Sequence, residues 1–362
     1  MANMFEYLRW RGDLRFSQVP LNHVDALILS TLAYVHYDGV VREDPLYVAP
    51  LKDVAREVLA LPEPENRCRV LNDLELLRAA AQTERFGAIG MTCYRNVFIP
   101  EEDTQFAAVT FLLEDGTAFL AFRGTDNSLV GWKEDFNMTF QESIPAQRLA
   151  DEYTQTFAYL KSLPLYLGGH SKGGNLAVYA GAKCGTEIQD RILRVYNHDG
   201  PGFTEAMMTD PGYMRIVPKI KTLVPQSSVF GMLLEHEEPY IVIRSREIGL
   251  MQHDPYSWEI MGGDFIPMEE LTADSRFLDR TFRTWLAGMD PAERNEFFDT
   301  VFDLLMMENA SRPSDIIRPQ NIRALFTTLQ TDPERRKIIA SVLLELVDAA
   351  RQAQLPPAQK EE

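Results

Sequence analysis

The sequence predicts an α/β fold with a mostly parallel central sheet flanked by helices and a C-terminal helical appendage. Three observations indicate this fold. In the middle of the chain, short apolar runs typical of buried strands alternate with segments of helical periodicity. A strand, a sharp turn and a helix follow one another around Ser171. Beyond about Phe265 only helical patterns remain, so we expect one domain over 1–264, with a mainly helical part at about 1–95, and a small helical domain over 265–362.

The composition limits what the chain can bind. Its 362 residues, 45% of them hydrophobic, are enough for one large domain or for a domain of about 250 residues with an appendage. Because 36 Lys and Arg stand against 53 Asp and Glu, the net charge of -17 repels nucleic acid and anionic membranes, and we expect no nucleic-acid partner. No apolar run reaches about 18 residues, which argues against stable membrane insertion.

The cysteines and the first residues favour a soluble, cytoplasmic protein. Cys68, Cys93 and Cys184 are few, odd in number and widely spaced, so neither a disulfide framework nor a zinc site is predicted. The opening stretch MANMFEYLRWRGDLRF carries charges where a signal peptide needs an apolar segment. No feature calls for a cofactor, and the sequence leaves the oligomeric state open.

Helical patterns dominate the N-terminal part. From Val24 to Val35 the apolar residues fall at helical spacing after Asn22, which can cap a helix. Further helical patterns run from Val54 to Leu61 and from Val70 to Gln82. The segment QFAAVTFLLEDGTAFLAFRG then contains two apolar runs joined at Glu114-Asp115-Gly116. Because Asp-Gly is a usual hairpin turn, this segment predicts two antiparallel strands.

Strands and helices alternate in the middle of the chain, and helices follow to its end. Ala146 to Ser162 has an amphipathic helical pattern, and the runs ILRVYNHDG and PYIVIRS indicate two further strands, so we expect a mostly parallel sheet with helices on both faces. The later helical patterns cover Phe277 to Met289, Ala292 to Met307, Pro319 to Gln330 and Pro333 to Gln352, with starts at Asp290-Pro291 and Asp332-Pro333. The polar, proline-rich residues from Leu355 onward are expected to be frayed.

The most informative stretch is LPLYLGGHSKGGNLAVYAG, which contains the pattern G-x-S-x-G around Ser171. Leu165 to Leu167 predicts a strand and Asn175 to Ala182 a helix, so Gly168 to Gly174 must reverse the chain. A serine on such a tight turn needs neighbours without a β-carbon, and glycines supply them on both sides. The N–H of Lys172, at the start of the helix, would then be one oxyanion donor. A phosphate-binding loop is excluded because the order Ser-Lys-Gly-Gly does not match its pattern.

A nucleophilic serine requires a histidine that takes its proton, and we expect that histidine after Ser171 in the chain. Three histidines follow it. His198 and Asp199 are neighbours at the end of a strand, so their side chains should point to opposite faces, and the acidic neighbours of His236 indicate a solvated loop. His253, in GLMQHDPYSW, follows the last predicted strand by a loop, where the base belongs. The competing interpretation is a histidine that packs or caps this loop.

The acid and the second oxyanion donor are placed by the same logic. Asp199 lies where the strand after the nucleophile helix ends, and the following turn can aim its carboxylate at His253. Alternatively, Asp199 closes an Asx-turn with the next glycine, which would leave Glu235 and Glu237 as reserve acids. The second donor should follow an earlier strand, and in AFLAFRGTDNSLVGWKEDF Thr125 or its neighbour can present a main-chain N–H.

Several of these stretches resemble known families. FRGT, with Trp132 and Asp135 downstream, together with GGHSKGGNLA, resembles the class 3 lipases. The sequence is still more similar to the bacterial Mbeg1-like family of the α/β-hydrolase fold. That likeness extends to YLRWRGDLRF, VDALILSTLAY, NHDGPGF, VPQSSVFGMLL and QHDPYSW, and so covers most of residues 7 to 258.

The resemblance implies an α/β-hydrolase in which Ser171 attacks an ester while Thr125 and Lys172 hold the oxyanion. The chain departs from the class 3 lipases in one respect: the segment that carries their triad aspartate is here VPQSSVFGMLL, and the corresponding position is Ser228. Either the acid has moved to Asp199 or the triad is incomplete. An incomplete triad would slow turnover by about ten-thousandfold, because the histidine would lack its orienting group.

Two functions from different classes therefore follow. The first is a serine hydrolase of the esterase or lipase type that cleaves acyl esters through an acyl-Ser171 intermediate released by water that His253 activates. A lipid-like or small-molecule ester is the expected substrate, on the resemblance and on an apolar, methionine-bearing stretch from Met207 to Met251. The second is a catalytically impaired binding or scaffold protein with a hydrolase fold, whose helical tail is the partner surface.

Overall fold

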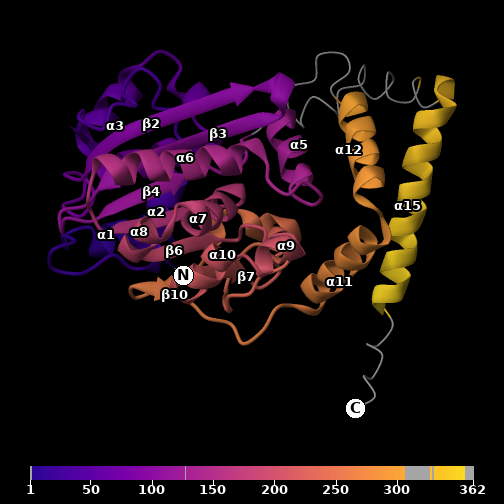
Figure 1. Ribbon diagram of the computed structural model, residues 1–362. Helices are drawn as coiled ribbons and strands as arrows, with labels where there is room; N and C mark the ends of the chain where they lie inside the picture. The colour runs from indigo at the N-terminus through magenta and orange to yellow at the C-terminus, as the bar shows by residue number, and fades with distance from the viewer. Residues whose placement is uncertain (1, 127, 306–326, 328–329, 355–362) are drawn as a thin grey trace.

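An eight-stranded sheet lies at the centre of the computed structural model, which describes residues 2–126, 128–305, 327 and 330–354 (Figure 1). The first four strands pair antiparallel and the pairings from β4 to β8 are parallel. In sheet order, which is also chain order, the strands are β1 (Ala49–Pro50), β2 (Gly90–Ile99), β3 (Thr104–Leu112), β4 (Ala118–Phe122), β5 (Leu165–His170), β6 (Ile192–His198), β7 (Ile220–Pro225) and β8 (Tyr240–Ile243). A separate pair is formed by β9 (Ile260–Met261) and β10 (Asp264–Phe265).

Helices cover both faces of this sheet, because its central strands are apolar on both sides. In β3, Val109 and Phe111 belong to one core cluster, whereas Phe106 and Ala108 belong to the other. The first cluster is shared with α1 (Met4–Arg11), α2 (His23–Leu32), α3 (Leu51–Ala60) and α4 (Leu71–Ala81). The second is shared with α6 (Pro145–Leu160), α7 (Lys172–Lys183) and α10 (Pro211–Ile216). The predicted α/β-hydrolase fold, with its mostly parallel sheet between helices, is confirmed.

Shorter helices connect these elements. The remaining α-helices of this part are α5 (Leu129–Asn137), α8 (Thr186–Arg191) and α9 (Glu205–Met208). The 3-10 helices are η1 (Pro64–Arg67), η2 (Pro100–Glu102), η3 (Val217–Lys219), η4 (Phe230–Met232), η5 (Gly249–His253) and η6 (Pro255–Ser257). Of these, α5, η4 and η5 lie beyond the carboxyl ends of strands, which is where ligands bind in open α/β sheets.

The C-terminal helices α11 (Ala273–Gly288), α12 (Pro291–Leu305) and α15 (Pro333–Gln354) form an appendage with its own apolar cluster, and Figure 1 shows α12 between α5 and α15. The appendage contacts the sheet domain through the rings of Phe136 and Phe298, whose centroids are 4.7 Å apart. Arg294 Nη1 also donates to Thr139 O at 2.7 Å. The division of the chain at residue 264 stays a prediction. The helix predicted over 319–330 lies largely outside the described residues, and the end from Leu355, expected to be frayed, lies wholly outside them.

The local predictions hold where a cap or a turn residue decides the structure. Asn22 Oδ1 accepts hydrogen bonds from Val24 N and Asp25 N and so caps α2. The β3–β4 hairpin closes with Leu113 N donating to Thr117 O at 2.9 Å, and Gly116 takes a φ of 85° in its turn. Asp290 caps α12 through Ala292 N and Glu293 N.

One turn is predicted too long, and five of the described strands are not predicted from the sequence: β1, β2, β7, β9 and β10. β2 begins inside the stretch expected to be mainly helical, which ends at about residue 95, and its pattern is broken by a bulge between Thr92 and Arg95. The expected reversal over Gly168 to Gly174 is wrong in extent, because β5 continues to His170 and α7 begins at Lys172. Ser171 alone forms the turn.

Candidate active site

Ser171 occupies the single-residue turn between β5 and α7. Its φ of 60° and ψ of −135° are rare for a residue with a side chain, and such strain costs on the order of 1–3 kcal/mol. The turn is held by Ser171 N, which donates to His198 O at 2.9 Å, and by Gly174 N, which donates to Ser171 O at 2.8 Å. This is the geometry that exposes a serine at the carboxyl edge of a sheet.

The two glycines of the G-x-S-x-G pattern are required by close packing of the main chain. A β-carbon on Gly169 would collide with the main chain of Gly173, and one on Gly173 would collide with the carbonyl oxygen of Phe122. These contacts explain why β5 can pass directly into α7 beside β4. The sequence therefore encodes the shape of this turn locally.

Asp199 follows β6 as Ser171 follows β5, and the two strands are in register at His170 and His198. Asp199 is buried, takes a φ of 55° and donates its main-chain N–H to Leu223 O of β7 at 2.8 Å. Its Oδ2 lies 2.6 Å from His253 Nδ1. The Asx-turn interpretation is not what the structure shows, because Asn197 Oδ1 accepts the hydrogen bond from Gly200 N at 2.9 Å.

Ser228 provides the other partner of the Asp199 carboxylate. Its hydroxyl donates to Asp199 Oδ1 at 2.5 Å, and its own carbonyl accepts from Ser275 Oγ of α11 at 2.5 Å. Both oxygens of the buried carboxylate are thus engaged, which fixes its orientation toward His253. Ser228, noted in the sequence as the place of an expected aspartate, is therefore a hydrogen-bond partner of Asp199, which follows the neighbouring strand β6.

The imidazole of His253 is held between two rings. The centroid of His170 lies 4.6 Å away on one side and that of Phe230 lies 4.6 Å away on another. The His253 side chain keeps 19% of its surface exposed, so a substrate can reach it. Among the described residues the His253 ring is hydrogen-bonded to Asp199 and not to Ser171. Ser171 is nevertheless near, because it directly follows His170, whose ring packs against that of His253. Hydrogen bonds to a nucleophile are often long before substrate binds.

The segment after β4 lies against Ser171. A β-carbon added to Gly124 would stand 3.2 Å from Ser171 Cβ and 2.5 Å from His170 O, so only glycine fits there. The next residue, Thr125, donates its hydroxyl to Asp135 Oδ2 at 2.5 Å, which ties this loop to α5. Lys172 is the first residue of α7, and the N–H groups of a first helical turn have no acceptor within the helix. Lys172 directly follows Ser171, and Thr125 follows the glycine that packs against it.

The side chain of Lys172 forms a buried ion pair that the sequence did not reveal. Its ammonium group donates to Glu134 Oε2 at 2.7 Å and to two oxygens of Gln105 at 2.9 Å, and both charged side chains are fully buried. Glu134 also accepts hydrogen bonds from the main-chain N–H groups of Gln105 and Ala146. This cluster joins the start of α7 to β3, α5 and α6.

We expect Glu134→Ala to lower the free energy of unfolding by about 3–5 kcal/mol, because it leaves the Lys172 ammonium buried without its counter-charge. Urea unfolding at neutral pH measures the change. The control is Glu152→Ala, which removes the same side-chain atoms from the exposed Arg95–Glu152 pair and should cost about 1 kcal/mol or less. Equal losses in the two variants would contradict this assignment.

Asp135 of α5, which accepts the Thr125 hydrogen bond, has a shifted pKa. Burial raises the pKa of its carboxyl from 3.8 to about 6, while the nearby charge of Lys172 and the bond from Thr125 act in the opposite direction. Lys172 Nζ lies 3.9 Å from Asp135 Oδ1, which is buried and has no hydrogen-bond partner among the described residues. The carboxyl thus keeps its proton to a higher pH than in the unfolded chain.

From this pKa we expect the contribution of Asp135 to the free energy of unfolding to fall as the pH rises from 3.8 to about 6. In that window the unfolded chain has lost the Asp135 proton and the folded protein still holds it. Urea unfolding of wild type and Asp135→Asn across the window isolates this contribution, and the free energy of wild type relative to the variant should fall as the pH rises. A difference between the two proteins that stays constant across the window would contradict the assignment.

The other histidines and acids considered for the site have partners away from Ser171 or are exposed. His198 is buried, its Nδ1 lies 3.2 Å from Gly169 O, and burial lowers its pKa to about 3. The expectation of a solvated His236 is wrong, because its ring is largely buried and bonds to Glu238 and to Gly231 O. Glu235 pairs with Arg283 of α11, and Glu237 is exposed.

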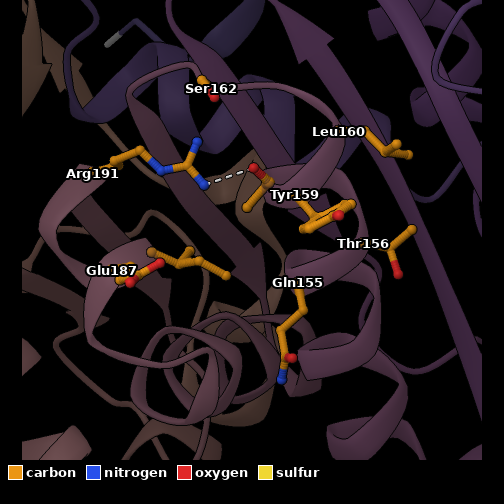
Figure 2. Close-up of a pocket in the computed structure, with 9 residues that line it drawn as sticks. Gln155, Thr156, Tyr159, Leu160, Ser162, Glu187 and Arg191 are labelled. Carbon is orange, nitrogen blue, oxygen red and sulfur yellow. Dashed lines mark hydrogen bonds between the residues drawn. The ribbon is translucent and has the colours of Figure 1, made fainter.

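A large surface pocket lies far from these residues. It has a volume of about 790 Å³ and is formed by the end of α6 and by α8, with Tyr159, Glu187 and Arg191 on its walls (Figure 2). Arg191 spans it and donates to Ala158 O at 2.7 Å. These helix ends precede β5 and β6, so the pocket lies at the amino ends of strands whose carboxyl ends carry Ser171 and Asp199. It is not the substrate site of this arrangement.

Neither a metal cluster nor a membrane span emerges from the described residues. In residues 2–126, 128–305, 327 and 330–354, no group of three His, Cys, Asp or Glu side chains is placed to hold a metal ion. No helix in this part of the chain is sufficiently long and apolar to cross a bilayer. The described cysteines, Cys68, Cys93 and Cys184, are all free thiols.

Comparison with known proteins shows to which family the chain belongs. The model of the Mbeg1-like family matches residues 80–303. The chain belongs to the Mbeg1-like family. Within this Mbeg1-like chain the match contains Ser171, Asp199, His253, Thr125 and Lys172, whereas α1, α2 and α3 precede it. No curated protein matches the sequence.

A solved structure is also similar to this Mbeg1-like chain. The crystal structure of M37 lipase has 13% sequence identity and a TM-score of 0.36, and the similarity covers 57% of this chain and 69% of the lipase. At this level of similarity no property of that lipase is transferred to this protein.

Sequence reasoning placed Ser171, Asp199 and His253 but missed the residues that hold them. Glu134 gave no signal, because a single glutamate on a helix is usually solvated. His170 lies inside the motif, but the motif assigns no role to this position. Ser228 was noticed only as the replacement of an aspartate, not as a partner of Asp199.

Proposed function

We propose that this Mbeg1-like protein is a serine hydrolase that cleaves acyl esters through an acyl-Ser171 intermediate. The observation that carries the proposal is the contact between Asp199 Oδ2 and His253 Nδ1, at the carboxyl edge where Ser171 forms its strained turn. Nucleophile, acid and base then follow in the chain order of the α/β-hydrolases. The same contact weakens the scaffold alternative, because that hypothesis rested on a missing acid.

The proposed chemistry follows from the tautomer of His253. A hydrogen bond from Nδ1 to the Asp199 carboxylate leaves Nε2 as the basic nitrogen. Nε2 takes the proton from Ser171 Oγ as the oxygen attacks the ester carbonyl. The negative oxygen of the tetrahedral intermediate accepts hydrogen bonds from the N–H groups of Lys172 and Thr125. His253 then gives its proton to the leaving alcohol, and water attacks the acyl enzyme in the same way.

An apolar substrate is favoured by the surroundings of His253. The residues before it expose Ile248, Leu250 and Met251 to 80%, 57% and 64% of their surface. Exposed apolar side chains beside a reactive group are typical of sites that take apolar ligands. The methionine-bearing stretch from Met207 to Met251 does not form one surface, because Met207 and Met232 are buried in different clusters. We therefore propose that the substrate is a lipid-like ester.

The proposed location is the cytoplasm, where cysteines stay reduced, and the described cysteines are free thiols.

Hydrolysis of p-nitrophenyl esters of increasing acyl length tests this function. We expect wild type to release p-nitrophenol above the Ser171→Ala background, with kcat/KM rising from acetate to longer chains. The rise reflects burial of each added methylene, which contributes about 0.8 kcal/mol when complete. Equal rates for wild type and Ser171→Ala on every ester would overturn the proposal.

A further inference from the structure

His170 is the last residue of β5 and the residue before Ser171, and its side chain is fully buried. Its ring packs against that of His253 with centroids 4.6 Å apart and meets Trp258 edge-on at 5.9 Å. Buried histidines with both nitrogens engaged are held in one orientation. In the chemistry proposed above this ring has no role, yet it packs against the ring of the candidate base and belongs to the residue before the candidate nucleophile.

The two nitrogens of His170 have partners of opposite kinds. Nε2 lies 2.8 Å from the carbonyl oxygen of His253, which can only accept, so Nε2 carries the proton. Nδ1 is then the acceptor of the Tyr34 hydroxyl at 3.0 Å, a shorter contact than that of the same hydroxyl with the His170 carbonyl oxygen at 3.3 Å. Burial together with the nearby positive groups lowers the pKa of His170 well below 6.5, so a single proton remains on the ring. One tautomer therefore satisfies every partner.

We propose that His170 is a positioning residue, which binds the main chain of His253 through Nε2 and is kept in the required tautomer by Tyr34. This inference rests on the proposed function, because it concerns how the base of that reaction is held. The Asp199 contact fixes only Nδ1 of His253. The bond from His170 fixes the main-chain carbonyl of the same residue, so His253 is restrained both at its ring and at its main chain.

Restraint is needed because His253 ends a short 3-10 helix in an exposed segment. Residues 248–251 are exposed, and only the buried Gln252 separates them from His253. Further along the same loop, Tyr256 OH donates to Asp73 Oδ1 of α4 at 2.8 Å. Tyr34 follows α2, and the guanidinium of Arg69 lies 4.3 Å from the centre of its ring. The loop that carries the candidate base is thus anchored by Tyr34, Arg69 and Asp73, which precede the part of the chain that the family model matches.

Three variants test the inference. His170→Phe keeps a ring but removes the donor, so we expect kcat to fall about 10- to 100-fold while KM stays within about twofold. In His170→Gln the side-chain amide can donate to the His253 carbonyl, and most of the activity should return. Tyr34→Phe keeps the volume and removes the hydroxyl that fixes the tautomer, so kcat should fall about 3- to 10-fold.

Besides kcat, we measure how fast a fluorophosphonate labels Ser171. The final extent of labelling counts the folded sites, and the rate is expressed per labelled site. A purely structural defect lowers the extent and leaves the rate per site unchanged, whereas loss of positioning lowers the rate per site. Wild-type rates in His170→Phe and Tyr34→Phe, or equal losses in His170→Phe and His170→Gln, would overturn the inference. If His170→Phe does not fold, the labelling rate of Tyr34→Phe alone decides whether the inference holds. An unlabelled but folded wild type would instead refute the proposed function.

Discussion

Replacing Ser171 by alanine is expected to reduce kcat for p-nitrophenyl butyrate by about 10⁶-fold, the largest effect of any single substitution in this chain. Removal of the attacking oxygen leaves only the oxyanion donors and substrate binding, which by themselves retain about 10³- to 10⁴-fold catalysis over water. Steady-state rates at high enzyme concentration measure the residual activity. The matched control is Ser162→Ala, an exposed serine in the remote pocket of Figure 2, which should keep wild-type rates.

The same argument predicts that losses at Ser171 and His253 are not additive. Because His253 acts only by moving the Ser171 proton, the double variant with alanine at both positions should be no slower than Ser171→Ala alone. A double variant slower by the product of the two single effects would show that the residues act independently. That result would contradict the proposed pair.

Substitution of Asp199 by asparagine is expected to cost about 10⁴-fold in kcat, with KM little changed. The carboxylate accepts from His253 Nδ1 and from the Ser228 hydroxyl, and an amide cannot accept strongly from both. A rotated amide offers a donor to Nδ1 and favours the tautomer whose Nε2 carries the proton, which cannot act as a base. Kinetics at saturating ester, with folding checked by thermal melting, measure the loss.

Two further variants separate the acid from its neighbours. Ser228→Ala removes one support of the carboxylate but not the acid, so its loss should be about tenfold, as expected for one hydrogen bond to a charged group. Glu235→Gln changes the reserve acid that instead pairs with Arg283, and activity should stay within about twofold. Activity lost with Glu235→Gln and retained with Asp199→Asn would transfer the acid role to Glu235.

The turn at Ser171 could be predicted because its cause is local in the sequence. Glycines at 169 and 173 are needed for contacts within the motif and with β4, and the apolar run before them and the helical pattern after them are visible in a short window. Asp199 and His253 could be placed because each follows a recognisable strand, and the carboxyl ends of parallel strands meet at one edge.

What the sequence could not predict depends on packing between segments. β2 has no clean alternation, because a bulge at Thr92 changes which side chains face the core. Glu134 looks like a surface glutamate until Lys172, 38 residues later, is buried beside it. His236 seemed solvated because its neighbours are acidic, yet it packs against the loop after β7. For Glu134 the partner is remote in the chain, whereas His236 bonds to Gly231 and Glu238, which are near in sequence, and its burial comes from the fold of the loop around it.

The most direct test of the central claim is mass spectrometry of the wild-type protein after reaction with a fluorophosphonate, followed by peptide mapping. The account predicts one phosphonyl group per chain on the peptide that contains Ser171, and markedly slower modification in His253→Ala and Asp199→Asn. Folded wild type that remains unmodified, or an adduct on a residue other than Ser171, would contradict it.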